Sequence, residues 1–107
     1  MNRRQKIEAM LAEEPGDTFL RYSLALELEK EGDHDRSLQG LRELMSDETP
    51  YVPAFFMAAQ QLVRLTRLGE ARAALRDGIE QARRQNNSHA AGEMADFLTS
   101  IGPLGDG

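Results

Sequence analysis

The side chains of this sequence that most resemble metal ligands are the run Asp33-His34-Asp35 and a second histidine, His89. Metal sites on helices commonly use two such ligands three or four residues apart, so that both project from one face. His89 has no second histidine at that spacing. The run Asp33-His34-Asp35 falls in a predicted turn between two helices, where we interpret it as structural. We therefore expect no metal ion and no other cofactor.

Groups that carry acid–base or nucleophilic catalysis in enzymes are present, but their spacing does not favour catalysis. The pairs Glu13-Glu14 and Asp47-Glu48 lie near predicted helix ends, where solvated charge is the simpler interpretation than a general-acid pair. Ser23 and Ser37 have no base in a fixed position to activate them. The chain has no cysteine, which excludes thiol catalysis, thiolate zinc sites and disulfides. We predict that the protein is not an enzyme.

Charge and hydropathy argue against two classes of partner. The formal net charge of −5 disfavours binding along a phosphate backbone. The pair Arg83-Arg84 lies at a predicted helix C-terminus, where the helix dipole favours cations. No stretch approaches the ~18 apolar residues of a membrane helix, and no apolar run follows the basic residues 1–6. We expect a cytoplasmic protein with neither nucleic-acid binding nor membrane insertion.

Proline, glycine and capping residues divide the chain into six predicted helices. They lie at about residues 2–13, 18–31, 35–45, 54–66, 70–85 and 88–100. No segment combines period-two alternation with β-branched residues, so no sheet is expected. Helices of this length joined by short turns give antiparallel neighbours.

A few residues mark the limits of these helices. Gly32 is predicted to follow the end of the second helix, and Ser88 to cap the start of the sixth. Residues 46–53 are predicted to form a loop, because prolines such as Pro53 are unsuited to a helix interior. Residues 102–107 are expected to form a flexible tail.

The chain repeats itself, because residues 17–50 align position by position with residues 51–84. We call the interval between aligned positions, such as 17 and 51, one repeat length. The aligned residues mostly share packing classes. The pairs are Ala25 and Ala59, Leu28 and Leu62, Leu41 and Leu75, Arg42 and Arg76, Tyr22 and Phe56, Lys30 and Arg64, Ser37 and Ala71, and Met45 and Ile79. Each unit therefore consists of two helices and a turn, with apolar residues three and four positions apart on one face. An unrelated six-helix bundle with an accidental period is the alternative.

The two ends of the chain keep the same register. A further shift by one repeat length places Ile7 at the position of Leu41 and Met10 at that of Leu44. Residues 1–16 therefore correspond to the second half of a repeat. The helix within residues 88–101 begins where a third unit would begin, and we expect it to cap the stack.

With these residues the chain resembles the tetratricopeptide-repeat (TPR) family, whose two-helix repeats combine aromatic, leucine and alanine positions and end in proline. The matching residues are Phe55, Ala58-Ala59, Leu62, Ala71 and Leu75 in the second unit and Leu24-Ala25, Leu28, Ser37 and Leu41 in the first. Arg21 stands where the family has a large aromatic residue, and Pro50 comes one residue after the family's terminal proline. The resemblance implies one domain over residues 1–101, an all-α, right-handed superhelix of about six antiparallel helices.

The resemblance also implies a function, because in this family the first helices line a concave face that binds peptides or helices of partner proteins. On this face we expect a groove formed by Tyr22, Leu26, Lys30, Phe56, Met57, Gln60, Arg64 and Met94. Aromatic and methionine side chains suit peptide anchoring because they bury a large area and adapt in shape. We therefore predict a protein–protein interaction module whose partner is a protein or peptide. Apolar residues at Tyr22, Leu26 and Met57 argue against a clamp for a free C-terminal carboxylate.

Two other interpretations use the same residues. The apolar side chains of the first helices could be core covered by neighbouring helices, which would leave no groove. Alternatively, the same apolar face could pair with itself, giving a homodimer with a structural or scaffold role.

Overall fold

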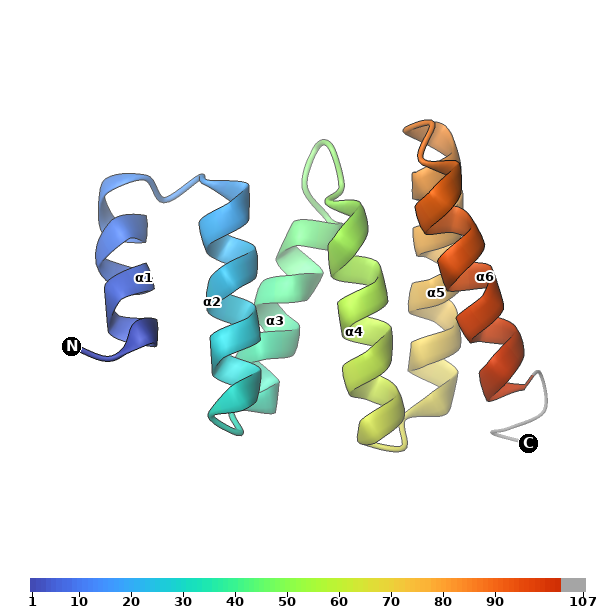
Figure 1. The fold of residues 1–107 in the computed structure, drawn as a ribbon, viewed down its shortest axis with the longest axis horizontal. Helices are drawn as coiled ribbons and strands as arrows, with labels where there is room; N and C mark the ends of the chain where they lie inside the picture. Colours follow the sequence, from blue (N-terminus) through green and yellow to red (C-terminus); the bar gives the residue numbers. More distant parts are fainter. Residues whose placement is uncertain (103–107) are drawn as a thin grey trace. The chain divides into compact units, whose positions relative to one another are not determined.

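The computed structural model of the chain describes residues 1–102 and contains two compact units, Met1–Tyr51 and Val52–Gly107. The described residues form six α-helices and no strand, which confirms the predicted all-α class (Figure 1). The helices are α1 (Arg3–Glu13), α2 (Thr18–Lys30), α3 (His34–Met45), α4 (Val52–Arg64), α5 (Leu68–Arg84) and α6 (Ser88–Ile101). The boundary between the units lies one residue after the predicted boundary between the two repeats. Except for Gly102, the predicted flexible tail lies outside the described residues.

Unit 1 contains α1, α2 and α3, and α2 packs against both of the others. All three helices have a side-chain N-cap, which accepts a hydrogen bond from a free N–H group of the first turn. Asn2 forms a capping box with Gln5, Asp17 accepts from the Leu20 N–H at 2.9 Å, and Asp33 accepts from the Arg36 N–H at 3.2 Å. The core consists of Ile7, Ala25, Leu28, Leu38, Leu41 and Leu44.

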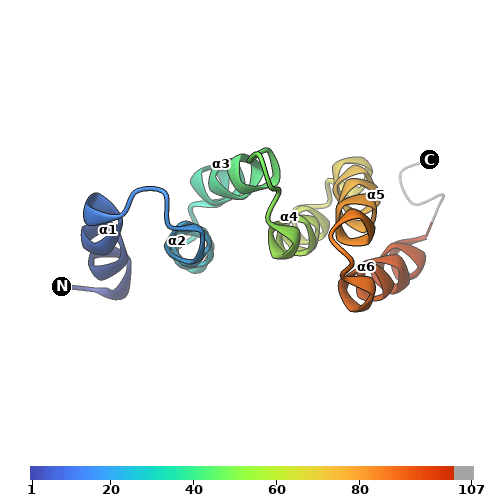
Figure 2. The same cartoon turned by 90° about the horizontal axis from the view of Figure 1, so that it is seen from above.

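Unit 2 contains α4, α5 and α6, and α5 lies beside both α4 and α6 (Figure 2). Two details of the predicted boundaries are wrong. Pro53 belongs to the first turn of α4. Proline is tolerated there because it lacks an N–H group, and the N–H groups of the first turn have no acceptor within the helix. The side chain that caps α6 is Asn87, which accepts from the Ala90 N–H at 3.1 Å, and not Ser88.

Three helices end in the same backbone motif, in which one residue adopts a left-handed conformation. That residue is Gly32 after α2 (φ 84°), Thr66 after α4 (φ 59°) and Asn86 after α5 (φ 61°). In each case the following N–H donates to a carbonyl near the end of the helix, from Asp33 to Leu28 at 2.9 Å, from Arg67 to Leu62 at 2.8 Å and from Asn87 to Ala82 at 2.7 Å. Gly32 and Thr66 are separated by one repeat length, so the backbone repeats at the period of the sequence.

Candidate partner-binding surfaces

The predicted groove residues of unit 1 form a line along α2, which we call the α2 strip. Its members Tyr22, Leu26 and Lys30 are four residues apart, and four residues is close to one helical turn. Tyr22 and Leu26 are half-buried and Lys30 is exposed. The Tyr22 ring meets the Tyr51 ring edge to face, with 5.3 Å between centroids. Burial, and to a smaller extent Tyr51, raises the pKa of the Tyr22 hydroxyl.

The corresponding residues of unit 2 form the α4 strip, which consists of Phe56, Gln60 and Arg64 with Met57 beside them. Phe56, Met57 and Gln60 are half-buried and Arg64 is exposed. The Phe56 ring packs against the ring of Phe97 from α6, with 5.4 Å between centroids. Both strips therefore combine an aromatic ring held by a second ring, a partly exposed middle and a cation at the end.

The prediction that Met94 extends the groove is wrong, because its side chain is fully buried. Met94 packs on Gly78 of α5 so closely that a Cβ atom at Gly78 would lie 2.6 Å from the Met94 sulfur atom. Met94 is therefore a core residue of unit 2. Sequence reasoning also missed Phe97, three residues further along α6, as the ring that holds Phe56.

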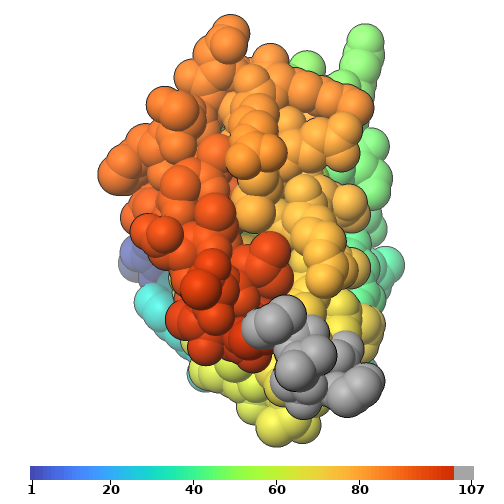
Figure 3. Space-filling view, turned by 90° about the vertical axis from the view of Figure 1, so that its right-hand side faces the viewer, coloured from blue at the N-terminus to red at the C-terminus, as the bar shows by residue number. Residues whose placement is uncertain are grey.

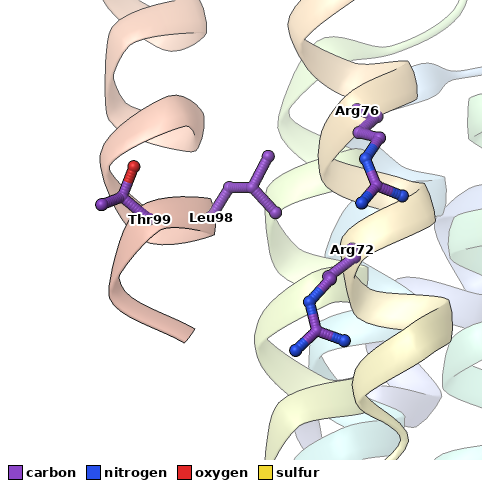
Figure 4. A pocket seen from close by; sticks show the side chains of 4 residues that line it. All are labelled: Arg72, Arg76, Leu98 and Thr99. Carbon is purple, nitrogen blue, oxygen red and sulfur yellow. The ribbon is translucent and has the colours of Figure 1, made fainter. Parts of the chain in front are cut away.

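A pocket of about 290 Å³ lies between α5 and α6 and is lined by Arg72, Arg76, Leu98 and Thr99. Figure 3 shows the surface that these two helices form together, and Figure 4 shows Leu98 pointing from α6 toward α5. Arg72 is only 2% exposed, and its Nε donates to the carbonyl oxygen of Gly102 at 2.8 Å. Two arginines one helical turn apart attract anions. The four lining residues include no base that could activate the Thr99 hydroxyl.

The residues considered for metal binding or catalysis have structural surroundings. Within residues 1–102 no three His, Asp or Glu side chains are placed to hold a metal ion. Asp33 caps α3, and His89 lies 3.4 Å from Glu93 on the surface of α6. The buried Ser37 hydroxyl donates to the carbonyl oxygen of Ala25 at 2.6 Å. None of the helices in this part of the chain is long and apolar enough to cross a membrane.

No family model, curated protein or solved structure matches the chain. The function of the chain is therefore inferred from the geometry of its own residues.

Proposed function

We propose that the chain is a helical repeat module of the TPR type that binds another polypeptide on the α2 and α4 strips. The repeat of a ring and a cation carries this proposal: Tyr22 and Lys30 recur one repeat length later as Phe56 and Arg64, with Leu26 and Gln60 at the equivalent positions between them. Packing against a second ring accounts for the two aromatic residues, but an exposed cation that only faced water would have no reason to recur two turns after the ring. In the proposed arrangement the repeats stack as a right-handed superhelix and α6 closes the stack.

Binding on these strips would draw on two contributions. Burial of a partly exposed apolar side chain such as Leu26 or Met57 contributes up to ~1.5–3 kcal/mol. Lys30 and Arg64 attract acidic or carbonyl groups of the partner and orient it, which affects selectivity and association rate more than affinity. Tyr22 and Phe56 are already held by Tyr51 and Phe97, so they offer preorganised ring surfaces.

Site-specific photo-cross-linking tests the proposal. A photoreactive residue is placed at Leu26 or Met57, and at Gln39 of α3 as an exposed control. Capture of the same polypeptide from Leu26 and Met57, but not from Gln39, identifies the partner. The purified partner should then bind Leu26→Glu and Met57→Glu at least about tenfold more weakly than the parent chain, because tenfold corresponds to only about 1.4 kcal/mol.

The matched variant Gln39→Glu adds the same charge outside the strips and should leave the affinity unchanged. Equal weakening by Gln39→Glu would reject the strips as the binding surface. Alanine at Tyr22 or Phe56 is a poorer test, because it also removes a ring contact that stabilises the unit.

The homodimer alternative makes a different prediction for the same variants. If the strips pair with a second copy, sedimentation of the parent chain shows a dimer that Leu26→Glu and Met57→Glu dissociate. A parent chain that stays monomeric at high concentration excludes this alternative. Amidating the C-terminus of a bound peptide should not weaken its binding, since neither strip has the polar set of a carboxylate clamp.

A further inference from the structure

A hollow between α1 and α2 of unit 1 forms a surface separate from the α2 strip. It has a volume of about 170 Å³, and its lining includes Lys6, Ile7, Met10, Phe19 and Leu20. Met10 and Phe19 are 47% and 68% exposed, and they are two of the three large hydrophobic side chains exposed in residues 1–102. Apolar side chains that gather around a hollow mark an interaction site more often than single exposed ones do.

The repeat register shows that part of this surface consists of residues whose equivalents in α3 belong to the core. Ile7 corresponds to Leu41 and Met10 to Leu44, one repeat length later. Ile7, Leu41 and Leu44 are all buried, at 4%, 0% and 0% exposure, whereas Met10 is not. The α1 helix therefore presents an exposed apolar residue, Met10, at the repeat position where α3 has the fully buried Leu44.

The rim of the hollow is basic in a chain whose net charge is −5. Arg3 and Lys6 both belong to the lining. The Arg3 Nε lies 2.7 Å from a carboxylate oxygen of Glu27, and the Arg3 side chain is 72% exposed. Lys6 is exposed and forms no ion pair with another residue of the described part of the chain. The hollow thus combines apolar walls with positive charge that is open to a partner.

We propose that this hollow binds an acidic amphipathic helix of another protein, which inserts an apolar side chain between Met10 and Phe19 and places carboxylates near Lys6 and Arg3. A second copy bound face to face would bring Arg3 and Lys6 of both copies together, which like-charge repulsion disfavours. An anionic membrane is disfavoured by the net charge of the chain and by the concave shape, which suits a single inserted side chain. This site goes beyond the proposed function, because it uses neither strip.

The chain has two lysines, and each reports on one candidate surface: Lys6 lines the hollow and Lys30 belongs to the α2 strip. The probe is a synthetic amphipathic peptide of about 15 residues, with leucines three and four residues apart and glutamates on both flanks. Acetylation of each lysine is followed by mass spectrometry. With the peptide at about ten times its dissociation constant, labelling of Lys6 should slow about tenfold, because roughly one site in ten is then free.

Variants and matched probes separate this site from the strip. Phe19→Ser should abolish protection of Lys6 without loss of helicity, whereas the control Leu26→Ser should preserve it. A peptide with lysines in place of the glutamates should bind at least about tenfold more weakly. Protection of Lys30 alone would reject the hollow as the binding site of the acidic peptide, but it would not contradict the proposed function of the strips. Equal binding of the lysine peptide, or binding to phosphatidylserine vesicles but not to the acidic peptide, would also overturn the proposed site in the hollow.

Discussion

The α2–α3 pair of unit 1 and the α4–α5 pair of unit 2 have the same backbone plan but different contacts between their helices. The plan includes the left-handed residue after the first helix and small residues such as Ala25 and Ala59, which are 1% and 0% exposed. At these positions a larger side chain would separate the paired helices. The repeat is therefore clearest where the backbones must come close or turn.

The large side chains are distributed differently in the two pairs. In unit 1 the second helix contributes the fully buried Leu44, and Arg21 of the first helix forms an ion pair with Asp47 at 2.7 Å. At the positions of Leu44 and Arg21, unit 2 has Gly78 and Phe55. Phe55 is 3% exposed and fills the space above Gly78 together with Met94. The bulky buried side chain is thus supplied by the second helix in unit 1 and by the first helix in unit 2, as expected where close packing is the constraint.

The largest predicted effect on the free energy of unfolding comes from replacing one glycine by alanine in each of the two helix pairs. A Cβ atom at Gly78 would lie 2.6 Å from the Phe55 Cβ and the Met94 sulfur, whereas at Gly40 the nearest atom, the Ala25 Cβ, is 3.7 Å away. Gly78→Ala should lower the free energy of unfolding by about 1–2 kcal/mol, because overpacking outweighs the gain in helix propensity. Gly40→Ala should raise it by up to about 1 kcal/mol, since only the propensity gain remains.

Urea unfolding measures both changes. Circular dichroism reports all helices, whereas tyrosine fluorescence reports unit 1, because the chain has two tyrosines, both in unit 1, and no tryptophan. A Gly78→Ala chain as stable as its parent would show that Met94 and Phe55 can move aside. The redistribution of volume between the two pairs would then not be a packing constraint.

Ser37 and Ala71 occupy the same repeat position, and their difference predicts the next effect. Ser37→Ala should lower the free energy of unfolding of unit 1 by about 0.5–1.5 kcal/mol, because it removes a buried hydrogen bond to the Ala25 carbonyl. Tyrosine-detected urea unfolding gives the value. Ser100→Ala in unit 2, measured by circular dichroism in urea, is the control, since its hydroxyl also donates to a carbonyl, that of Phe97, but at an exposed site. Equal losses in both variants would show that burial of the Ser37 bond is unimportant.

The sequence predicted the six helices well, because their limits depend on local signals. Glycine after α2 and the aspartates that cap α2 and α3 act within a few positions of the helix ends. The cap of α6 was missed because Asn86, Asn87 and Ser88 can all cap a helix. Their backbone angles determine which of them is the cap: Asn86 adopts the left-handed conformation that ends α5, and Asn87 is the N-cap of α6.

The candidate surfaces were predicted less well, because they depend on which helix covers which side chain. Apolar spacing placed Met94 on a helix face, but the sequence alone did not show that this face packs on Gly78. The pocket at Arg72 and the contact of Phe56 with Phe97 join residues from different helices that lie far apart in the sequence. No local pattern identifies such pairs, whereas the strips were predictable because each lies on one helix.

A smaller effect is expected at the left-handed residues that end α2 and α4. Thr66 has φ 59°, a conformation that costs a residue with a Cβ atom about 1–2 kcal/mol. Thr66→Gly should raise the free energy of unfolding by about 0.5–1 kcal/mol, because the greater entropy of unfolded glycine offsets part of the gain. Gly32→Ala should have the opposite sign, with φ 84° at that position. A loss of stability in Thr66→Gly, measured by circular dichroism in urea, would contradict the equivalence of the two helix ends.

The smallest effect concerns the ion pair that unit 1 has and unit 2 lacks, since Phe55 and Gln81 occupy the positions of Arg21 and Asp47. Hydrogen bonds from Arg21 hold the pKa of Asp47 below its ordinary value. The resulting stability is therefore present above about pH 4 and is lost as the pH falls through the lowered pKa. Because both side chains are partly exposed, at 24% and 31%, the pair contributes at most about 1 kcal/mol.

Asp47→Asn should accordingly be slightly less stable than the parent chain at pH 7, and the difference should vanish near pH 2 or in concentrated salt. Tyrosine-detected urea unfolding at the two pH values measures this difference in unit 1. Glu48→Gln in the same unit is the control, because exposed Glu48 forms no ion pair with another described residue and its loss should not change the pH dependence. A difference for Asp47→Asn that persists at pH 2 would assign the contribution of Asp47 to its shape and hydrogen bonding, not to its charge.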